Sequence, residues 1–302
     1  MSPTFLRSAT LVVPDVEVAT QRYMRWFDYS VVEQGIVTQS LAAFWLSPGS
    51  TGRRYSVLQP ASLAPVFLRF VEGVDVPDYQ PMCTYGWAAT EICVQDVEVV
   101  NERMLRSPFQ IIGPPTALDG FPTVKPMQIR GPDSEIIYLT EVLIDGPSSG
   151  LPTAESLIDR PFIMVLACSD LRKSITWMEE TFGLPVSDPV KIKSSVLSAA
   201  YGMDPGEKHE LCIVKGAGQT FLELDQCPES ATTRPRHDDA LPPGVAITTM
   251  IFPDFERLSG NWVMPPVTRE GIVYGGCRVG MLRTPDGALL EVLEGPTDRI
   301  GL

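Results

Sequence analysis

The stretch SATLVVPDVEVATQRYMRW, residues 8–26, joins the two patterns that decide the fold. Its first part, up to Val13, is rich in β-branched and apolar residues, which is typical of a buried strand. Asp15 then offers a carboxylate that can accept a hydrogen bond from an amide of a first helical turn, so it is a favoured helix N-cap. Apolar side chains follow at helical spacing, at Val16, Ala19, Tyr23 and Trp26. The stretch therefore predicts a strand that leads directly into a helix packed on a sheet.

The same pattern recurs three more times along the chain. A β-rich run ends in Asp, and a helical apolar pattern follows, in ATEICVQD (to Asp96), IMVLACSD (to Asp170) and ITTMIFPD (to Asp254). Successive aspartates lie roughly 80 residues apart, which indicates four repeated modules. Further strands are predicted after the helices, at YSVVEQG, LAAFWLS, RRYSVLQ and PVFLRFV in module 1 and at SSVLSAAYG, HELCIVKG and TFLELDQ in module 3. This order predicts βαβββ modules and an α+β protein.

A longer repeat groups the modules in pairs. RGPDSEIIYLTE and RTPDGALLEVLE each place a Pro-Asp turn, at Asp133 and Asp286, before an apolar strand. Two halves of about 150 residues, each with two modules, account for both periods. We predict an N-terminal domain over 1–146, a Pro-, Gly- and Ser-rich linker over 147–159, and a C-terminal domain over 160–302. The modules are expected over about 5–75, 85–145, 160–228 and 243–296, and each domain is expected to form one open, cup-shaped mixed sheet.

Composition limits the classes of partner. The chain has 24 Lys and Arg against 37 Asp and Glu, a net charge of −13. This balance argues against nucleic acid or an anionic membrane surface, because both demand basic patches. No apolar run has the length of a membrane span, and the N-terminus does not resemble a signal peptide. Six scattered cysteines are typical of a reduced, cytoplasmic protein. We therefore expect a cytoplasmic monomer or homodimer whose partner is a small molecule.

These motifs together resemble the vicinal oxygen chelate superfamily. The resemblance rests on the four strand-Asp-helix motifs, the Pro-Asp turns ahead of a final strand, and Phe182-Gly183-Leu184 after the third helix. It covers nearly the whole chain, and four modules in one chain are similar to the extradiol dioxygenases. It implies two tandem domains like those of glyoxalase I, bleomycin-resistance proteins and extradiol dioxygenases. It also implies a divalent metal in a cup, held by a residue seven before each helix-capping Asp and by one five after the Asp of the Pro-Asp turn.

Counting to these positions gives the expected cups. The N-terminal cup is expected to present Ser8, Ala89, Arg69 and Tyr138. The C-terminal cup is expected to present Ile163, Ile247, Glu223 and Glu291. Neither of the two histidines of the chain, His209 and His237, falls in this register. Two carboxylates without imidazole are a poor set for the iron of a dioxygenase, so we expect the metal ligands to be lost and no metal or other cofactor to be used.

Strand alternation adds four residues to the first of these cups. Residues two and four positions after a ligand-like position share its face, which places Thr10 and Val12 beside Ser8, and Glu91 and Cys93 beside Ala89. Cys93 is also explained as a packing residue. Glu91 lies in a strand that is otherwise apolar or small, where a carboxylate is paired or has a raised pKa suited to proton transfer. The alternatives for Glu91 are a structural ion pair with Arg69 or a one-residue slip that turns it to solvent.

The remaining polar candidates also keep two interpretations. Arg69 and Tyr138 are suited to bind a carboxylate, enolate or phenolate, although Arg can extend to a rim and Tyr commonly fills strands. Glu223 and Glu291 either share a proton as a pair or are remnants of a metal site. His209 either lines a pocket or satisfies a local hydrogen bond.

Three hypotheses of function follow. The first is a metal-independent, cofactor-free lyase or isomerase that moves a proton on a small apolar, aromatic or oxygenated substrate. Its catalytic residues are expected to be Glu91, Glu291 and Tyr138, and its substrate-binding residues Ser8, Thr10, Arg69, Cys93, His209 and Glu223. The second is a non-catalytic protein of the bleomycin-resistance type that sequesters a small molecule among aromatic side chains such as Trp45. The third, a metal-dependent extradiol dioxygenase, requires the strand register to be wrong in several modules.

Overall fold

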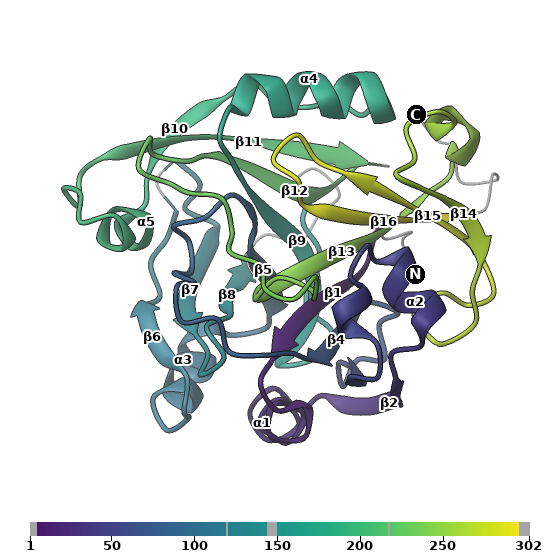
Figure 1. The fold of residues 1–302 in the computed structure, drawn as a ribbon. Coiled ribbons are helices and arrows are strands. Elements are labelled where there is room, and N and C mark those ends of the chain that lie inside the picture. The colour runs from purple at the N-terminus through teal and green to yellow at the C-terminus, as the bar shows by residue number, and fades with distance from the viewer. Residues whose placement is uncertain (1–4, 119, 144–149, 217, 296–302) are drawn as a thin grey trace.

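The strands of the chain form two eight-stranded mixed sheets with few helices (Figure 1). The computed structural model describes residues 5–118, 120–143, 150–216 and 218–295. This architecture confirms the predicted α+β fold class with mixed sheets. Within the described ranges, no helix combines the length and the apolarity that crossing a membrane requires.

Four modules follow one another along the chain. Module 1 contains β1 (Leu6–Val13), α1 (Val16–Phe27), β2 (Ser30–Ile36), α2 (Gln39–Phe44), η1 (Pro48–Ser50), β3 (Arg54–Gln59) and β4 (Phe67–Glu72). Module 2 contains β5 (Gly86–Val94), α3 (Val97–Met104), β6 (Gln110–Gly113), β7 (Val124–Arg130) and β8 (Ile136–Val142). Module 3 contains β9 (Ile158–Cys168), α4 (Leu171–Phe182), β10 (Val190–Lys193), α5 (Ser195–Ala200), β11 (Lys208–Gly216) and β12 (Gln219–Gln226). Module 4 contains β13 (Gly244–Phe252), η2 (Phe255–Leu258), β14 (Met264–Thr268), β15 (Arg278–Arg283) and β16 (Leu289–Glu294).

Three of the four Asp residues cap helices as predicted. The Asp15 carboxylate accepts hydrogen bonds from the amides of Glu17 and Val18, and Asp96 and Asp170 do the same at the starts of α3 and α4. The fourth expectation is wrong, because Asp254 makes no side-chain cap and only the short 3-10 helix η2 follows. The Ser-Gly-Asn sequence after η2, with Gly260 at a φ of 91°, turns the chain away before a longer helix can form.

Two segments predicted as strands are helices. LAAFWLS lies largely in α2 and SSVLSAAYG in α5. The hydroxyl of Thr38 accepts from the amide of Leu41 at 3.2 Å, and Ser194 caps Leu197 at 3.3 Å. These N-caps and the alanines that follow them favour helix over the strand that the apolar pattern indicated. Both helices lie next to candidate sites.

The modules pair differently from the prediction. One sheet has the order β14-β15-β16-β13-β1-β4-β3-β2, so it combines modules 4 and 1. The other has the order β10-β11-β12-β9-β5-β8-β7-β6 and combines modules 3 and 2. We call their inner faces the terminal cup (modules 1 and 4) and the central cup (modules 2 and 3). The prediction that each cup is formed by the two modules of one half of the sequence is therefore wrong. The first strand of a module can pair with the first strand of any other module, and the repeat period does not determine the partner.

The two sheets share one core. Their outer faces and helices α1, α3 and α4 contribute to a single large apolar cluster that includes Tyr23, Phe27, Phe70 and Met164. Figure 1 shows β1, β13, β5 and β9 near the centre of the molecule, with α1 and α4 at opposite sides. The inner faces carry separate apolar clusters, so each cup is walled off from the shared core.

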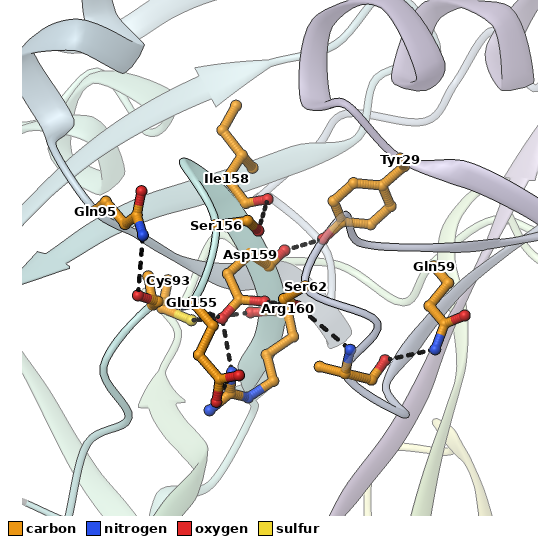
Figure 2. Close-up of polar contacts among 12 residues, drawn as sticks. Tyr29, Gln59, Ser62, Cys93, Gln95, Glu155, Ser156, Ile158, Asp159 and Arg160 are labelled. Carbon is orange, nitrogen blue, oxygen red and sulfur yellow. Dashed lines mark hydrogen bonds and ion pairs between the residues drawn. The ribbon is translucent and has the colours of Figure 1, made fainter.

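A buried polar junction connects three modules around Asp159 (Figure 2). β9 begins at Ile158, inside the predicted linker, whose residues 147–149 lie outside the described residues. The Asp159 carboxylate accepts hydrogen bonds from the Ser62 hydroxyl, the Glu155 amide at 2.8 Å and the Arg160 guanidinium at 2.6 Å. Because Asp159 is fully buried, these donors replace the water that its charge would otherwise bind.

We expect the Asp159→Ala substitution to lower the free energy of unfolding by about 2–3 kcal/mol, because it leaves a buried amide and guanidinium without their acceptor. Urea denaturation followed by far-UV circular dichroism measures this loss. Ser62→Ala, which removes one donor and keeps the ion pair, should cost about 1 kcal/mol. Equal stability of Asp159→Ala and the wild type would show that the junction is dispensable.

Candidate functional site

Glu291 lies at the bottom of the terminal cup, on β16. Its side chain is 0% exposed and accepts four hydrogen bonds. Oε1 accepts from the Trp45 indole and the Tyr274 hydroxyl, each at 2.7 Å. Oε2 accepts from the Thr249 hydroxyl at 2.6 Å and from Arg69 Nη2 at 3.0 Å. Both oxygens are thus occupied by donors, which suits a carboxylate that organises its neighbours.

Arg69 is the cation of this network. Its Nε donates to the Thr10 hydroxyl at 2.9 Å and its Nη1 to the Tyr274 hydroxyl at 2.8 Å, and its guanidinium stacks 4.6 Å from the Trp45 ring centroid. Burial lowers the pKa of Arg69, but Tyr274 and Glu291 raise it more, so the net pKa is raised. One alternative for Glu91, a structural ion pair with Arg69, is wrong, because the partner of Arg69 is Glu291.

The terminal cup does not fit a divalent metal. Of the predicted ligand positions, Ser8 only donates to the Thr249 hydroxyl at 3.0 Å, and Ile247 packs in the apolar cluster. One carboxylate remains, and the Arg69 guanidinium already lies beside it. A metal ion there would face a fixed positive charge and would have to displace the donors of Glu291.

A pocket of about 360 Å³ opens from this network. Trp45, Val57, Arg69, Val273 and Tyr274 form its buried floor. Its more exposed rim includes Glu33, Ile36, Thr38, Arg269 and Glu270. Helix α2, which the sequence pattern did not predict, contributes Leu41 to the wall. The volume is within the range of small-molecule sites.

The central cup holds a different set of polar residues. Glu91 on β5 and Tyr138 on β8 are register partners, and Glu223 and Asp225 lie two residues apart on β12, which is separated from β5 by β9. Glu91 is buried, whereas Tyr138, Glu223 and Asp225 keep part of their surface exposed. Glu223 and Glu291 lie on different sheets, so the expected pair between them is wrong.

The carboxyl groups of the central cup raise one another's pKa. Burial and the charge of Glu223 raise the pKa of Glu91 to about 8, against a hydrogen bond from the Thr140 hydroxyl. Burial and Glu91 raise the pKa of Asp225 to about 7. Burial and Asp225 hold the pKa of Glu223 well above its ordinary value. Within the described part of the chain, none of the three carboxyl groups forms an ion pair.

The raised pKa values predict that stability falls as pH rises. A carboxyl group with a higher pKa in the folded state stabilises the fold fully below its unfolded pKa and loses this contribution as pH passes its folded pKa. For Glu91 the window runs from about 4.5 to about 8. We expect the free energy of unfolding to be about 4 kcal/mol lower at pH 9 than at pH 5, measured by urea denaturation.

The Glu91→Gln variant should reduce this dependence without abolishing it, because burial still raises the pKa of Asp225 and Glu223. Glu135, which lies in a separate cluster and whose pKa is raised to about 7 mainly by burial, should leave a smaller slope of the same sign. A wild type that gains stability between pH 5 and pH 9 would contradict the raised pKa values.

The central cup also lacks a metal-ligand arrangement. Ala89 and Ile163, at two predicted ligand positions, are buried apolar side chains. Carboxylate oxygens suit hard cations, but among the residues placed by the structure no group of three His, Cys, Asp or Glu side chains is arranged to hold a metal ion. The residues of neither cup therefore fit the metal that the fold resemblance implied.

Two predicted residues lie away from the reactive groups. Cys93 packs with Phe162 and Ile163, and its sulfur lies 3.8 Å from a carboxylate oxygen of Asp159. The nitrogen Nε2 of His209 lies 3.0 Å from the Ser198 hydroxyl of α5. This buried contact is the local hydrogen bond that the sequence left as one alternative for His209.

Two residues of the cups, Asp225 and Tyr274, were missed from sequence. Asp225 has a clear signal, because alternation places it on the same face of β12 as Glu223. Tyr274 has none, because it reaches Glu291 from a segment outside the strands. Trp45 was expected near a binding site, but its hydrogen bond to Glu291 was not.

Solved structures match the chain over nearly its whole length. Glyoxalase I from Zea mays matches with 16% identity and a TM-score of 0.61, over 96% of this chain and 92% of that one. A point variant of that enzyme matches with 15% identity and a TM-score of 0.65, over 96% and 93%. A protein from Bacillus subtilis subsp. subtilis str. 168, named as a candidate dioxygenase, matches with 14% identity and a TM-score of 0.59, over 98% and 87%. No family model and no curated protein matches the sequence. At these identities the likeness is one of fold.

Proposed function

Because the chain has the fold of the vicinal oxygen chelate superfamily, we propose that it is a metal-independent enzyme of this fold. In this proposal it is a lyase or isomerase that transfers a proton on a small apolar, aromatic or oxygenated substrate in the central cup. One observation carries the proposal: three carboxyl groups on one sheet, Glu91, Glu223 and Asp225, influence one another and Tyr138 electrostatically, with no ion pair among the described residues. Such a cluster retains protons near neutral pH, as proton transfer requires.

Each group of the cluster has a distinct chemical role in the proposal. At neutral pH the cluster holds both ionised and protonated carboxyl groups, and its pKa values belong to the cluster as a whole. Ionised Asp225 takes a proton from the substrate, and protonated Glu91 returns one to the substrate at the position where the product needs it. Burial and the three carboxyl groups raise the pKa of Tyr138, so its hydroxyl stays protonated and donates to the oxygen on which negative charge develops. Glu223 shares its proton with Asp225 and thereby adjusts the pKa of Asp225.

The surroundings of the cluster support access for a small apolar molecule. Val196 and Leu197 of α5 belong to the same apolar cluster as Ala89 and Val165 of the cup, and Tyr138 packs against it. Tyr138, Glu223 and Asp225 are partly exposed, and the proposal requires that a substrate reaches them from this exposed side. Glu291 is assigned a positioning role instead, because it is fully buried and accepts four hydrogen bonds.

Deuterium exchange tests the proposed chemistry without knowledge of the product. A panel of small aromatic and aliphatic carbonyl compounds is incubated with the protein in D2O, and proton NMR records loss of signal at carbons next to the carbonyl group. We expect at least one compound to exchange faster with wild-type protein than with buffer, and the rate to persist after treatment with EDTA. If EDTA abolished all exchange, the proposed metal independence would be wrong. If no compound of the panel exchanged, the result would count against the proposed proton transfer.

The pocket of the terminal cup favours a second candidate function. Trp45, Tyr55 and Tyr274 line a pocket of about 360 Å³, which supports non-catalytic binding of a small molecule as in the bleomycin-resistance type. A ligand recovered unchanged after long incubation with the protein favours this function over catalysis.

We propose the location and the oligomeric state of the protein from its composition and its sheet topology. Free cysteines throughout the described chain support a cytoplasmic location, and pairing of modules within one chain is compatible with a monomer or a homodimer. We propose the division at 1–146 and 160–302 as a division of the sequence into two repeats. In the structure, each sheet combines one module from the first repeat with one from the second.

A further inference from the structure

We propose that the terminal cup is a second ligand site, distinct from the central cup, which binds a small aromatic monocarboxylate with Arg69 as a fixed cation at its floor. The inference rests on the pocket that favours the second candidate function, and it names the ligand class that this pocket takes. It requires no catalysis in the central cup.

At the floor of the pocket, Arg69 has N–H groups that its three side-chain hydrogen bonds do not use. A guanidinium carries five N–H groups, and three hydrogen bonds of Arg69, to Thr10, Tyr274 and Glu291, use one each on Nε, Nη1 and Nη2. Two N–H groups, one on each terminal nitrogen, therefore remain for a ligand. Arg69 is 2% exposed and lines the pocket, so these donors lie where water competes little.

The paired Glu291 leaves these donors available. It accepts only one hydrogen bond from Arg69, because its other three donors are on Trp45, Thr249 and Tyr274. One guanidinium can bridge two carboxylates in this way, because its planar donor set points in more than one direction. A carboxylate at the floor therefore adds a charge-assisted hydrogen bond without breaking the existing ion pair.

The walls select a flat, apolar body. Trp45, Tyr55 and Tyr274 supply aromatic surface, and Leu41 of α2 and Val57 of β3 supply aliphatic surface. The hydroxyl of Tyr55 is already engaged, since it donates to Glu33 at 2.8 Å. An aromatic ring fits between these side chains while its carboxylate reaches the floor.

The rim disfavours a second negative charge. Glu33, which accepts from Tyr55 and from the Ile272 amide, and the exposed Glu270 both line the opening. Arg269 is the opposing cation there, but its guanidinium stacks on Phe44 and donates to the Ser40 carbonyl. A ligand that extends from the floor to the rim therefore meets two carboxylates at its outer end, which favours a monoanion over a dianion.

Isothermal titration calorimetry with three probes tests the inference on the wild-type chain. We expect benzoate to bind about tenfold more tightly than benzamide, its neutral isostere, because only benzoate forms the charge-assisted bond. Terephthalate, which carries a second carboxylate at its outer end, should bind about threefold more weakly than benzoate or worse. The Glu270→Gln variant should reduce this penalty, whereas Glu102→Gln, an exposed control on α3, should leave it unchanged.

NMR of the Trp45 indole N–H, assigned with a Trp45→Phe variant, locates the probe, because this group donates to Glu291 beside the pocket. Its signal should shift on addition of benzoate. Equal affinities for benzoate and benzamide would overturn the ligand class and leave the second candidate function standing. Binding of neither probe, with no shift of the Trp45 signal, would overturn the site and remove the support for that function as well.

Discussion

The Asp225→Asn variant is expected to lower the rate of substrate proton exchange by about 100-fold or more, with the fold retained. Asn keeps the shape of Asp225 but cannot accept a proton at neutral pH. The pKa of Asp225, raised to about 7 by burial and by Glu91, makes it the group of the cluster best placed to act as a base. The exchange rate of the wild type should also fall below about pH 7, as the base is protonated, and above about pH 8, as Glu91 loses its proton.

A matched surface variant separates this effect from a general loss of charge. Asp188→Asn changes an exposed aspartate of the same module and should exchange protons at the wild-type rate. Circular dichroism of both variants checks that they fold. If the Asp225→Asn variant were fully active on a substrate that the wild type exchanges, Asp225 would not be the base. If the Glu91→Gln variant were also fully active, the carboxyl cluster would have no part in the mechanism.

Glu291→Leu is expected to produce the largest loss of stability, about 3–5 kcal/mol, because it leaves the buried Arg69 guanidinium without its counter-ion. The variant also leaves the Trp45 indole and the Tyr274 hydroxyl without the carboxylate that accepts their hydrogen bonds. Urea denaturation at pH 7 measures the change in the free energy of unfolding.

The double variant Arg69→Met with Glu291→Leu tests the cause. Replacing both charges by apolar side chains of similar size removes the unpaired charge, so we expect it to recover at least half of the lost stability. If the double variant were less stable than Glu291→Leu alone, Arg69 would stabilise the fold independently of Glu291, and the network would need another explanation.

The fold was predictable because its signal is local and repeated. A strand, an Asp cap and a helix lie within about 20 residues, and three of the four caps form the predicted hydrogen bonds. The errors arise where local patterns compete, as at α2 and α5, whose apolar residues fit a strand but whose Thr38 and Ser194 caps favour a helix.

The candidate site was predictable only in part. Period-two alternation predicted that Glu91 lies in one cup with Tyr138, and the two residues are register partners in the structure. Arg69 was predicted in this same cup but lies on the other sheet. The pairing of module 1 with module 4 was not predictable, because it depends on which strand edges meet in three dimensions. That pairing determines that Arg69 neutralises Glu291, and it separates Arg69 from the acidic cluster around Glu91.

Carbon-13 NMR titration of the side-chain carboxyl groups, from pH 4 to pH 10, tests the central claim most directly. The signals of Asp225 and Glu91, assigned with Asp225→Asn and Glu91→Gln variants, should titrate with midpoints near pH 7 and pH 8. The midpoints should not move when EDTA is added. Titration of both groups below about pH 5 would mean that the central cup is ionised at neutral pH, and the proposed acid and base would then be absent.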